Sequence, residues 1–229
     1  MAKKNEKQEE PIQFVEQTLS KTEQFIEKNQ KILTYVVTAI VIVILGFILI
    51  KKYYIGAKEI EAQNQIWTAQ RYFEADSLDL ALTGDGNYLG FHEIISDYAW
   101  TKSSNLSKFY LGLIYLKQGD FEQALTYLKK FSTKSRILSS MALGAIADSY
   151  VELGDMEAAV KYYKKAADKY PNDFTSPIFL MKAGFAYEEM QKYDEALKMY
   201  EKIKFEHYNS NERRDIEKYI SKVKTLLES

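Results

Sequence analysis

The sequence predicts an all-α protein with one transmembrane helix, a solenoid of stacked helical hairpins and a C-terminal capping helix. Three observations support this fold class. Residues 32–50 form an uncharged apolar run, a pattern of small and aromatic residues recurs three times between residues 105 and 210, and the 229 residues include only 3 Pro and 10 Gly. So few helix-breaking residues favour long helices over a turn-rich β structure.

The charge balance and the lack of cysteine exclude several classes of function. Lys and Arg number 31 and Asp and Glu number 32, which gives a formal net charge of -1. This balance lacks the basic excess that is typical of a nucleic-acid-binding domain. The chain has no Cys, which excludes disulfide bonds, thiolate metal sites and a Cys nucleophile but identifies no cellular compartment.

Residues 32–50 read ILTYVVTAIVIVILGFILI and are predicted to cross a membrane as one helix. Nineteen residues rise about 28 Å as an α-helix, close to the thickness of the hydrocarbon core. Residues that suit the membrane interface flank the run: Lys28, Lys31, Lys51, Lys52, Tyr53 and Tyr54. A buried core helix and a cleaved signal peptide are the alternatives. A buried core helix rarely runs this long without a polar break. A signal peptide is disfavoured because the run begins after thirty-one residues and exceeds the length of a signal-peptide core.

Flanking charge does not determine the topology, because residues 17–31 and 51–65 contain three Lys each. The positive-inside rule therefore favours neither orientation. A short charged tail most simply stays in the cytosol. We therefore expect residues 1–31 to be cytosolic and the C-terminal domain to lie on the other side of the membrane.

Within this tail, residues 1–10 are polar and are expected to be disordered. Ile12, Val15, Leu19 and Ile26 then fall near one face of a predicted helix. Two interpretations of this amphipathic segment stand. It contacts the membrane surface or another membrane protein, or it continues the transmembrane helix.

Three stretches, residues 105–138, 140–173 and 177–210, share one pattern. Each has a small residue in its first half: Gly112, Ala147 and Gly184. A Tyr follows three residues later: Tyr115, Tyr150 and Tyr187. An Ala follows nine residues after the Tyr: Ala124, Ala159 and Ala196. The Tyr positions are 35 and then 37 residues apart, and this recurrence in register indicates an internal repeat.

The repeated residues are those that a helical hairpin requires. A small residue lets a second helix approach closely, and a Tyr three residues later lies on the same face and fills the adjoining space. Gly119 and Gly154 suit the left-handed position that ends a helix, and the Asp after each one suits the N-cap of the next helix. No such hairpin buries its apolar face alone, so the units must stack.

The segments on either side of the repeats are also predicted to be helical. Residues 51–104 are interpreted as a linker helix and a degenerate first hairpin with a loop insertion at residues 84–87. The candidate buried positions of its first helix are Ile60, Ile66, Trp67, Ala69 and Phe73. Residues 211–229 are predicted to form a capping helix, with this apolar stripe: Ile216, Tyr219, Ile220, Val223 and Leu226.

The repeated pattern resembles the tetratricopeptide repeat, in which a small residue, a Tyr, an Ala, an aromatic residue and a Pro recur in this order. The resemblance covers residues 105–210, with Pro171 at the end of the second copy. The first copy departs from the pattern at Lys108, and the third has Gln191 and Lys192 in place of Gly and Asp. The resemblance implies a solenoid whose first helices line a concave groove that binds protein partners.

Carried onto this sequence, the groove positions of the repeat are Phe109, Leu113, Leu116, Lys117, Met141, Gly144, Asp148, Val151, Glu152, Ile178, Met181, Phe185, Glu188 and Glu189. Such a groove is apolar at one end and acidic at the other. It suits a helix or an extended apolar segment of a partner. The alternative is that these side chains pack against a neighbouring helix or against the degenerate first hairpin.

No constellation in the sequence indicates catalysis, a cofactor or a metal. His92 and His207 are far apart in sequence, and neither has the neighbours that a metal site or a base–nucleophile pair requires. The segment Asp85, Gly86, Asn87 lacks the ligand spacing of a Ca²⁺ loop and is interpreted as a turn. We therefore expect no enzyme activity.

The whole arrangement resembles the ancillary subunit of the bacterial SecYEG translocon, a single-pass protein with a periplasmic tetratricopeptide domain. That resemblance implies a scaffold in the inner membrane with a cytosolic N-terminus and a periplasmic repeat domain. Its implied partners are translocon subunits, a membrane-anchored periplasmic peptidyl-prolyl isomerase-like chaperone, and emerging chains. Two alternatives remain open: an adaptor for another envelope complex, and a cytosol-facing regulator that sequesters a soluble partner.

Overall fold

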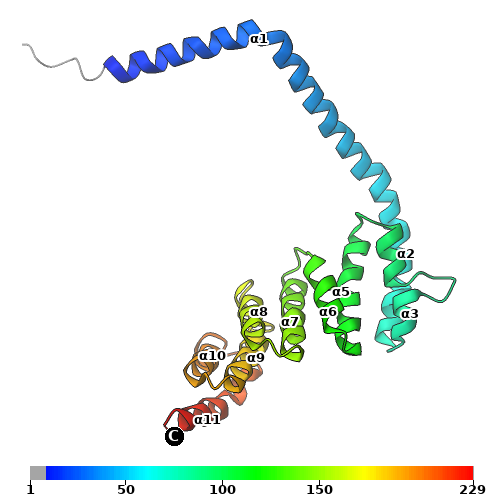
Figure 1. The fold of residues 1–229 in the computed structure, drawn as a ribbon, viewed down its shortest axis with the longest axis vertical. Coiled ribbons are helices and arrows are strands. Elements are labelled where there is room, and N and C mark those ends of the chain that lie inside the picture. The colour runs from blue at the N-terminus through cyan, green and yellow to red at the C-terminus, as the bar shows by residue number, and fades with distance from the viewer. Residues whose placement is uncertain (1–8, 229) are drawn as a thin grey trace, which may run out of the picture. The chain divides into compact units, whose positions relative to one another are not determined.

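The structure is a computed structural model that describes residues 9–228, and this part of the chain is helical without any strand (Figure 1). The predicted all-α fold class is therefore confirmed. The chain divides into two compact units, Met1–Gly56 and Ala57–Ser229. Each unit is described by itself.

The first unit consists of helix α1 (Glu9–Leu49), which is followed by a π-helical turn (Ile50–Ile55). An 18-residue window in the helical segment that starts at Phe25 has a mean hydropathy of 2.9, and none of it is buried. The helix is thus long enough and apolar enough to cross a membrane.

Helix α1 also includes Glu9 and Glu10, which were expected to be disordered. The rest of that tail, residues 1–8, lies outside the described residues. Of the expected amphipathic face only the side chain of Ile26 is described, and it is half exposed. The other three side chains of that face lie outside the described part.

The second unit is a series of helices that stack in chain order (Figure 1). The first three are α2 (Gly56–Glu74), α3 (Leu78–Thr83) and α4 (Phe91–Asp97). Three helical hairpins follow: α5 (Lys102–Gln118) with α6 (Phe121–Lys130), α7 (Arg136–Glu152) with α8 (Met156–Asp168), and α9 (Ser176–Glu189) with α10 (Tyr193–Glu206). A 3₁₀ turn (Glu212–Arg214) and α11 (Ile216–Glu228) complete the stack.

The tight turn inside each hairpin has the same backbone conformation. Gly119 and Gly154 have φ angles of 82° and 78°, and the Asp that follows each Gly accepts a hydrogen bond from the backbone three residues later. In the third hairpin Gln191 has a φ of 56°. This copy therefore makes the same turn without glycine, at a cost in backbone strain.

The small residues of the pattern lie where two helices approach closely. A Cβ atom on Gly112 would lie 2.4 Å from Cγ of Leu128, and one on Gly184 would lie 2.2 Å from Cε1 of Tyr200. The predicted close approach within the hairpins is confirmed at both positions. Gly144, which was expected to line the groove, is instead buried, and a Cβ there would lie 2.0 Å from the Phe179 ring.

The core runs along the stack as three adjoining clusters. Tyr115 contacts both the cluster that the first three helices share with α5 and the next one, between the first and second hairpins. Tyr150 contacts that second cluster and the third, which extends into α11. Each repeat thus buries apolar surface mainly against its neighbours, as in other solenoids.

Side-chain contacts between successive repeats reflect the repeat length. Three ion pairs and one Asp–His hydrogen bond join residues that are 34 positions apart in sequence: Asp148 with Lys182, Asp168 with Lys202, Glu188 with Lys222, and Asp173 with His207. A partly exposed ion pair such as Asp168–Lys202 contributes little to stability by itself. Their common spacing shows that the repeats keep one register from α7 to α11.

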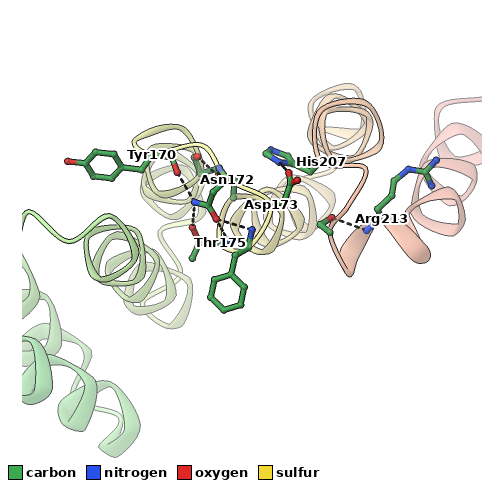
Figure 2. Close-up of polar contacts among 10 residues, drawn as sticks. Tyr170, Asn172, Asp173, Thr175, His207 and Arg213 are labelled. Carbon is green, nitrogen blue, oxygen red and sulfur yellow. Dashed lines mark hydrogen bonds and ion pairs between the residues drawn. The ribbon is translucent and has the colours of Figure 1, made fainter.

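The connection from α8 to α9 is ordered by a side-chain network (Figure 2). The side-chain oxygen of Asn172 accepts hydrogen bonds from the backbone N–H groups of Phe174 (2.9 Å) and Thr175 (2.7 Å), and its amide nitrogen donates to the Tyr170 carbonyl (2.7 Å). The Asp173 carboxylate lies 3.0 Å from Nδ1 of His207, which is buried after α10. His207 therefore links the connection that precedes α9 to the connection that follows α10.

In the degenerate first hairpin, the residues of α2 that are buried differ in part from those that the sequence predicted. Ile66 and Ala69 are buried as predicted, and Phe73 is half-buried. The predictions for Ile60 and Trp67 are wrong, because these side chains are 67% and 59% exposed. Only one side of α2 is covered by the domain, so the helical period alone overestimates how many of its apolar residues are buried.

The loop insertion is an ordered turn centred on Asp85. Its carboxylate accepts hydrogen bonds from the backbone N–H groups of Tyr88 (2.7 Å) and Asn87 (2.9 Å) and from the Tyr72 hydroxyl (2.7 Å). These donors, the Tyr88 N–H first, lower the pKa of Asp85. Its oxygens are thus used within the loop.

His92 joins this first hairpin to the repeats. Its Nε2 lies 2.9 Å from the Tyr115 hydroxyl, and its ring meets the Tyr115 and Tyr127 rings edge-on. Burial lowers the pKa of His92, because desolvation disfavours the charged imidazole.

We expect this histidine to make the first hairpin less stable in acid. A folded-state pKa below the unfolded value (about 6.5) means that the contribution of His92 is fully present above that value and is lost as the pH falls through the folded-state pKa. The apparent melting temperature should therefore fall between about pH 7.5 and about pH 5.5. His92→Gln, which does not titrate, should flatten this dependence in thermal scans. An equal slope in both proteins would contradict the assignment.

Candidate protein-binding groove

The first helices of the three hairpins, α5, α7 and α9, follow one another along one side of the stack. A hollow of about 490 Å³ opens there, with this lining: Leu116, Lys117, Gly119, Phe121, Asp148, Val151, Glu152, Tyr163 and Lys182. Five of these are groove residues that the sequence predicted: Leu116, Lys117, Asp148, Val151 and Glu152. The structure thus brings the middle of the expected groove together.

Asp148 is the polar centre of the hollow. Its Oδ1 accepts hydrogen bonds from Nζ of Lys182 (2.7 Å) and from the Tyr163 hydroxyl (2.5 Å). Burial and the neighbouring Asp148 raise the pKa of the Tyr163 hydroxyl, so it stays a donor at physiological pH. These contacts hold the Asp148 carboxylate in one position while it remains partly open to solvent.

The rest of the lining combines apolar and charged surface. Leu116, Phe121 and Val151 are half-buried, and Lys117 and Glu152 are exposed. Nζ of Lys117 pairs with Asp76 at 2.5 Å, with both side chains more than half exposed. Such a pair is weak in water, so the Lys117 ammonium remains accessible to a partner.

The third-repeat end of the expected groove is covered by the capping helix α11. The Phe185 ring lies 5.4 Å from the Tyr219 ring. Glu188 accepts hydrogen bonds from the Tyr200 hydroxyl and from Nζ of Lys222, and its side chain is only 10% exposed. At this end the Glu188 side chain is therefore covered by its own chain, as in the alternative of intramolecular packing. The Phe185 side chain is only partly covered and remains 41% exposed.

Phe109 also differs from its expected position. Its ring is only 4% exposed and packs 5.1 Å from the Phe131 ring and 5.8 Å from the Tyr110 ring. Phe109 therefore belongs to the core between the first two hairpins. This contact depends on Phe131, which follows α6 and lies outside the repeated pattern.

The remaining predicted positions surround the hollow without lining it. Leu113, Ile178 and Met181 are half-buried against the core clusters. Met141 is 44% exposed, and Glu189 is exposed. None of these five residues belongs to the lining of the hollow.

Sequence reasoning missed Phe121, Tyr163 and Lys182. Lys182 had a usable signal, because it lies 34 residues after Asp148 and carries the opposite charge. Residues one repeat apart on successive first helices are neighbours in a solenoid. Phe121 and Tyr163 belong to second helices, which the groove positions of the repeat do not include.

The described residues contain no cluster of three or more His, Cys, Asp or Glu side chains that could hold a metal ion. The stacked hairpins form a helical-repeat solenoid, and the hollow on the side of their first helices is open to a protein segment.

The repeats are similar to a known repeat. Residues 109–174 and residues 179–204 match two sequence profiles of the tetratricopeptide repeat. The crystal structure of the MamA protein is similar, with a TM-score of 0.51 and 18% sequence identity over 76% of this chain and 93% of that one. This likeness shows the shared fold. No curated protein matches the sequence.

Proposed function

We propose that the protein is a membrane-anchored scaffold that holds a segment of a partner protein in the hollow between α5, α7, α8 and α9. One observation carries this proposal. The middle of the first-helix face is open at Leu116, Val151 and Glu152, whereas α11 covers the third-repeat end. The apolar helix α1 supports the anchoring.

The lining indicates the chemistry of the partner segment. Leu116, Phe121 and Val151 offer an apolar surface for one or two apolar side chains. Lys117 and Glu152 carry opposite charges beside it, so they suit a segment with charges of both signs around its apolar residues. We infer an extended or helical protein segment rather than a small molecule.

For the cellular setting, we propose an ancillary role at the bacterial SecYEG translocon. The N-terminus is cytosolic in this proposal, and the repeat domain is periplasmic. There the hollow recruits a membrane-anchored chaperone or contacts emerging chains. Support comes from the combination of one apolar helix with a following tetratricopeptide domain, and from the apolar part of the hollow, which suits the apolar side chains of the unfolded segments present at a translocon exit.

The test is photo-crosslinking in intact cells followed by purification in mild detergent and mass spectrometry. A photoreactive amino acid replaces Val151 in the hollow or, as a matched control, the exposed Thr126 on α6. We expect partner cross-links from position 151 only. Glu152→Lys should reduce their yield at least about fivefold. Glu122→Lys, the same change at an exposed residue outside the lining, should not.

Each part of the proposal has its own contrary outcome. Equal cross-linking from both positions, or equal capture by the two Lys variants, would reject the hollow as the binding site. Partners from another envelope complex would reject the translocon assignment but leave the scaffold. Exclusively cytosolic partners would reject the proposed orientation.

A further inference from the structure

Trp100 combines an almost fully exposed side chain with a left-handed backbone, and no packing within the second unit accounts for this combination. It lies in the connection from α4 to α5, its side chain is 88% exposed, and its φ angle is 73°. A left-handed backbone costs free energy for any residue other than glycine, and the exposed ring recovers none of that cost by packing. An observed outlier of this kind points to a role outside the fold itself.

The backbone around Trp100 is well ordered. The Thr101 hydroxyl donates to the Tyr98 carbonyl at 2.6 Å and accepts from the Ser104 N–H at 3.0 Å, as the N-cap of α5. The turn is therefore hydrogen-bonded on both sides of the tryptophan.

The surroundings of Trp100 combine aromatic and basic side chains. Tyr98 lies two positions before Trp100 and Lys102 two positions after it, and Nζ of Lys58 lies 5.1 Å from the centre of the Tyr98 ring. We call Lys58, Tyr98, Trp100 and Lys102 the Trp100 edge. Exposed aromatic residues beside Lys are typical of the membrane–water interface, where an amphipathic ring lies at the level of the lipid headgroups.

The Trp100 edge lies at the start of α2. The Glu59 carboxylate accepts hydrogen bonds from the Lys102 N–H and from the Ser103 hydroxyl (2.8 Å), which ties the first turn of α2 to the first turn of α5. Glu59 follows Ile50, the last residue of the apolar run, by nine positions. Nine residues span at most about 32 Å even when fully extended. This short tether therefore limits how far the Trp100 edge can move from the bilayer surface, whatever the orientation of the repeat domain.

We propose that Trp100 inserts into the headgroup region of the bilayer that anchors the chain, with Lys58 and Lys102 beside anionic lipid headgroups. The inference rests on the membrane anchoring in the proposed function. It adds a second membrane contact, which restricts how freely the repeat domain turns about its tether. The occupant of the edge is a lipid surface, because the tether holds it there and its basic and aromatic residues match that chemistry.

Tryptophan fluorescence of the full-length protein tests this proposal. The chain has two Trp residues, so Trp67→Phe leaves Trp100 as the only reporter. Trp100→Phe leaves Trp67, which is 59% exposed on α2 and lies seventeen positions beyond Ile50, as the matched control. Both variants are reconstituted into phosphatidylcholine vesicles with about a quarter phosphatidylglycerol, with and without lipids brominated near the glycerol end of the acyl chains.

We expect brominated lipid to remove at least about half of the Trp100 emission and to leave Trp67 within about a tenth of its starting value. Flotation of the vesicles measures anchoring separately. Protein that floats without quenching of Trp100 would overturn the proposal and leave the anchor in place, pointing to a protein partner for the edge. Protein that does not float would overturn both, while the cross-linking from position 151 would still test the scaffold.

A second variant separates this role from a structural one. Trp100→Gly suits the left-handed backbone, so its melting temperature should be equal to or higher than that of the natural protein. A clear drop would show that the ring stabilises the fold and would overturn the proposal.

Discussion

Gly184→Val should lower the free energy of unfolding of the repeat domain by about 3 kcal/mol or more. The Cβ atom that valine adds would lie 2.2 Å from Cε1 of Tyr200 and 2.6 Å from its Cζ. Tyr200 is fully buried and its hydroxyl donates to Glu188, so the ring has little room to move. Helices α9 and α10 must separate, which weakens the third repeat and the cap that packs on it.

The matched control is Gly56→Val, because Gly56 is helical and has no atom within 4 Å of an added Cβ. Valine is slightly better than glycine in a helix, so this change should be neutral or weakly stabilising. Urea unfolding followed by circular dichroism measures both variants. Equal midpoints for the two would show that the α9–α10 contact tolerates a side chain and would contradict the close-approach argument.

Val223→Asp should detach the capping helix α11 from the third repeat. Val223 and Ile216 are fully buried against the third hairpin, and Ile220 is nearly fully buried there. An unpaired carboxylate in this environment costs about 3 kcal/mol or more. Releasing α11 avoids that cost but exposes the apolar face that it covers, including Tyr200 and Ile203. A solenoid without its cap then self-associates.

Limited proteolysis and light scattering of the detergent-solubilised chain measure this effect. We expect early cleavage within α11 and a larger apparent mass for Val223→Asp. Ser221→Asp places the same charge on the exposed face of the same helix and should behave as the unchanged protein. If the two variants are equally resistant and equally monodisperse, the cap is not required.

Much of the fold follows from local patterns. Gly112 and Gly184 were recognised as close-approach positions because a small residue three positions before a Tyr has one plausible use in a hairpin. The turns at Gly119 and Gly154 were predicted because glycine suits the left-handed position that ends a helix, and both residues have a positive φ angle. The predictions for Ile60 and Trp67 failed because a helical period identifies the apolar face of α2 but not how much of that face another element covers.

The candidate site was predictable only in part. Leu116, Asp148, Val151 and Glu152 come together as the repeat pattern implies, because first helices of successive repeats are neighbours. Tyr163 was missed because it reaches the hollow from a second helix.

By itself, the sequence determined the helical class, the repeat unit and the apolar helix, since each depends on residues within about one repeat of one another. The tertiary structure decided which part of the groove is open. Phe109 is buried by Phe131 from outside the pattern, and Glu188 is covered by Lys222 from the cap. Side-chain exposure depends on what the neighbouring elements place opposite each residue, and a periodic pattern within one chain segment does not contain that information.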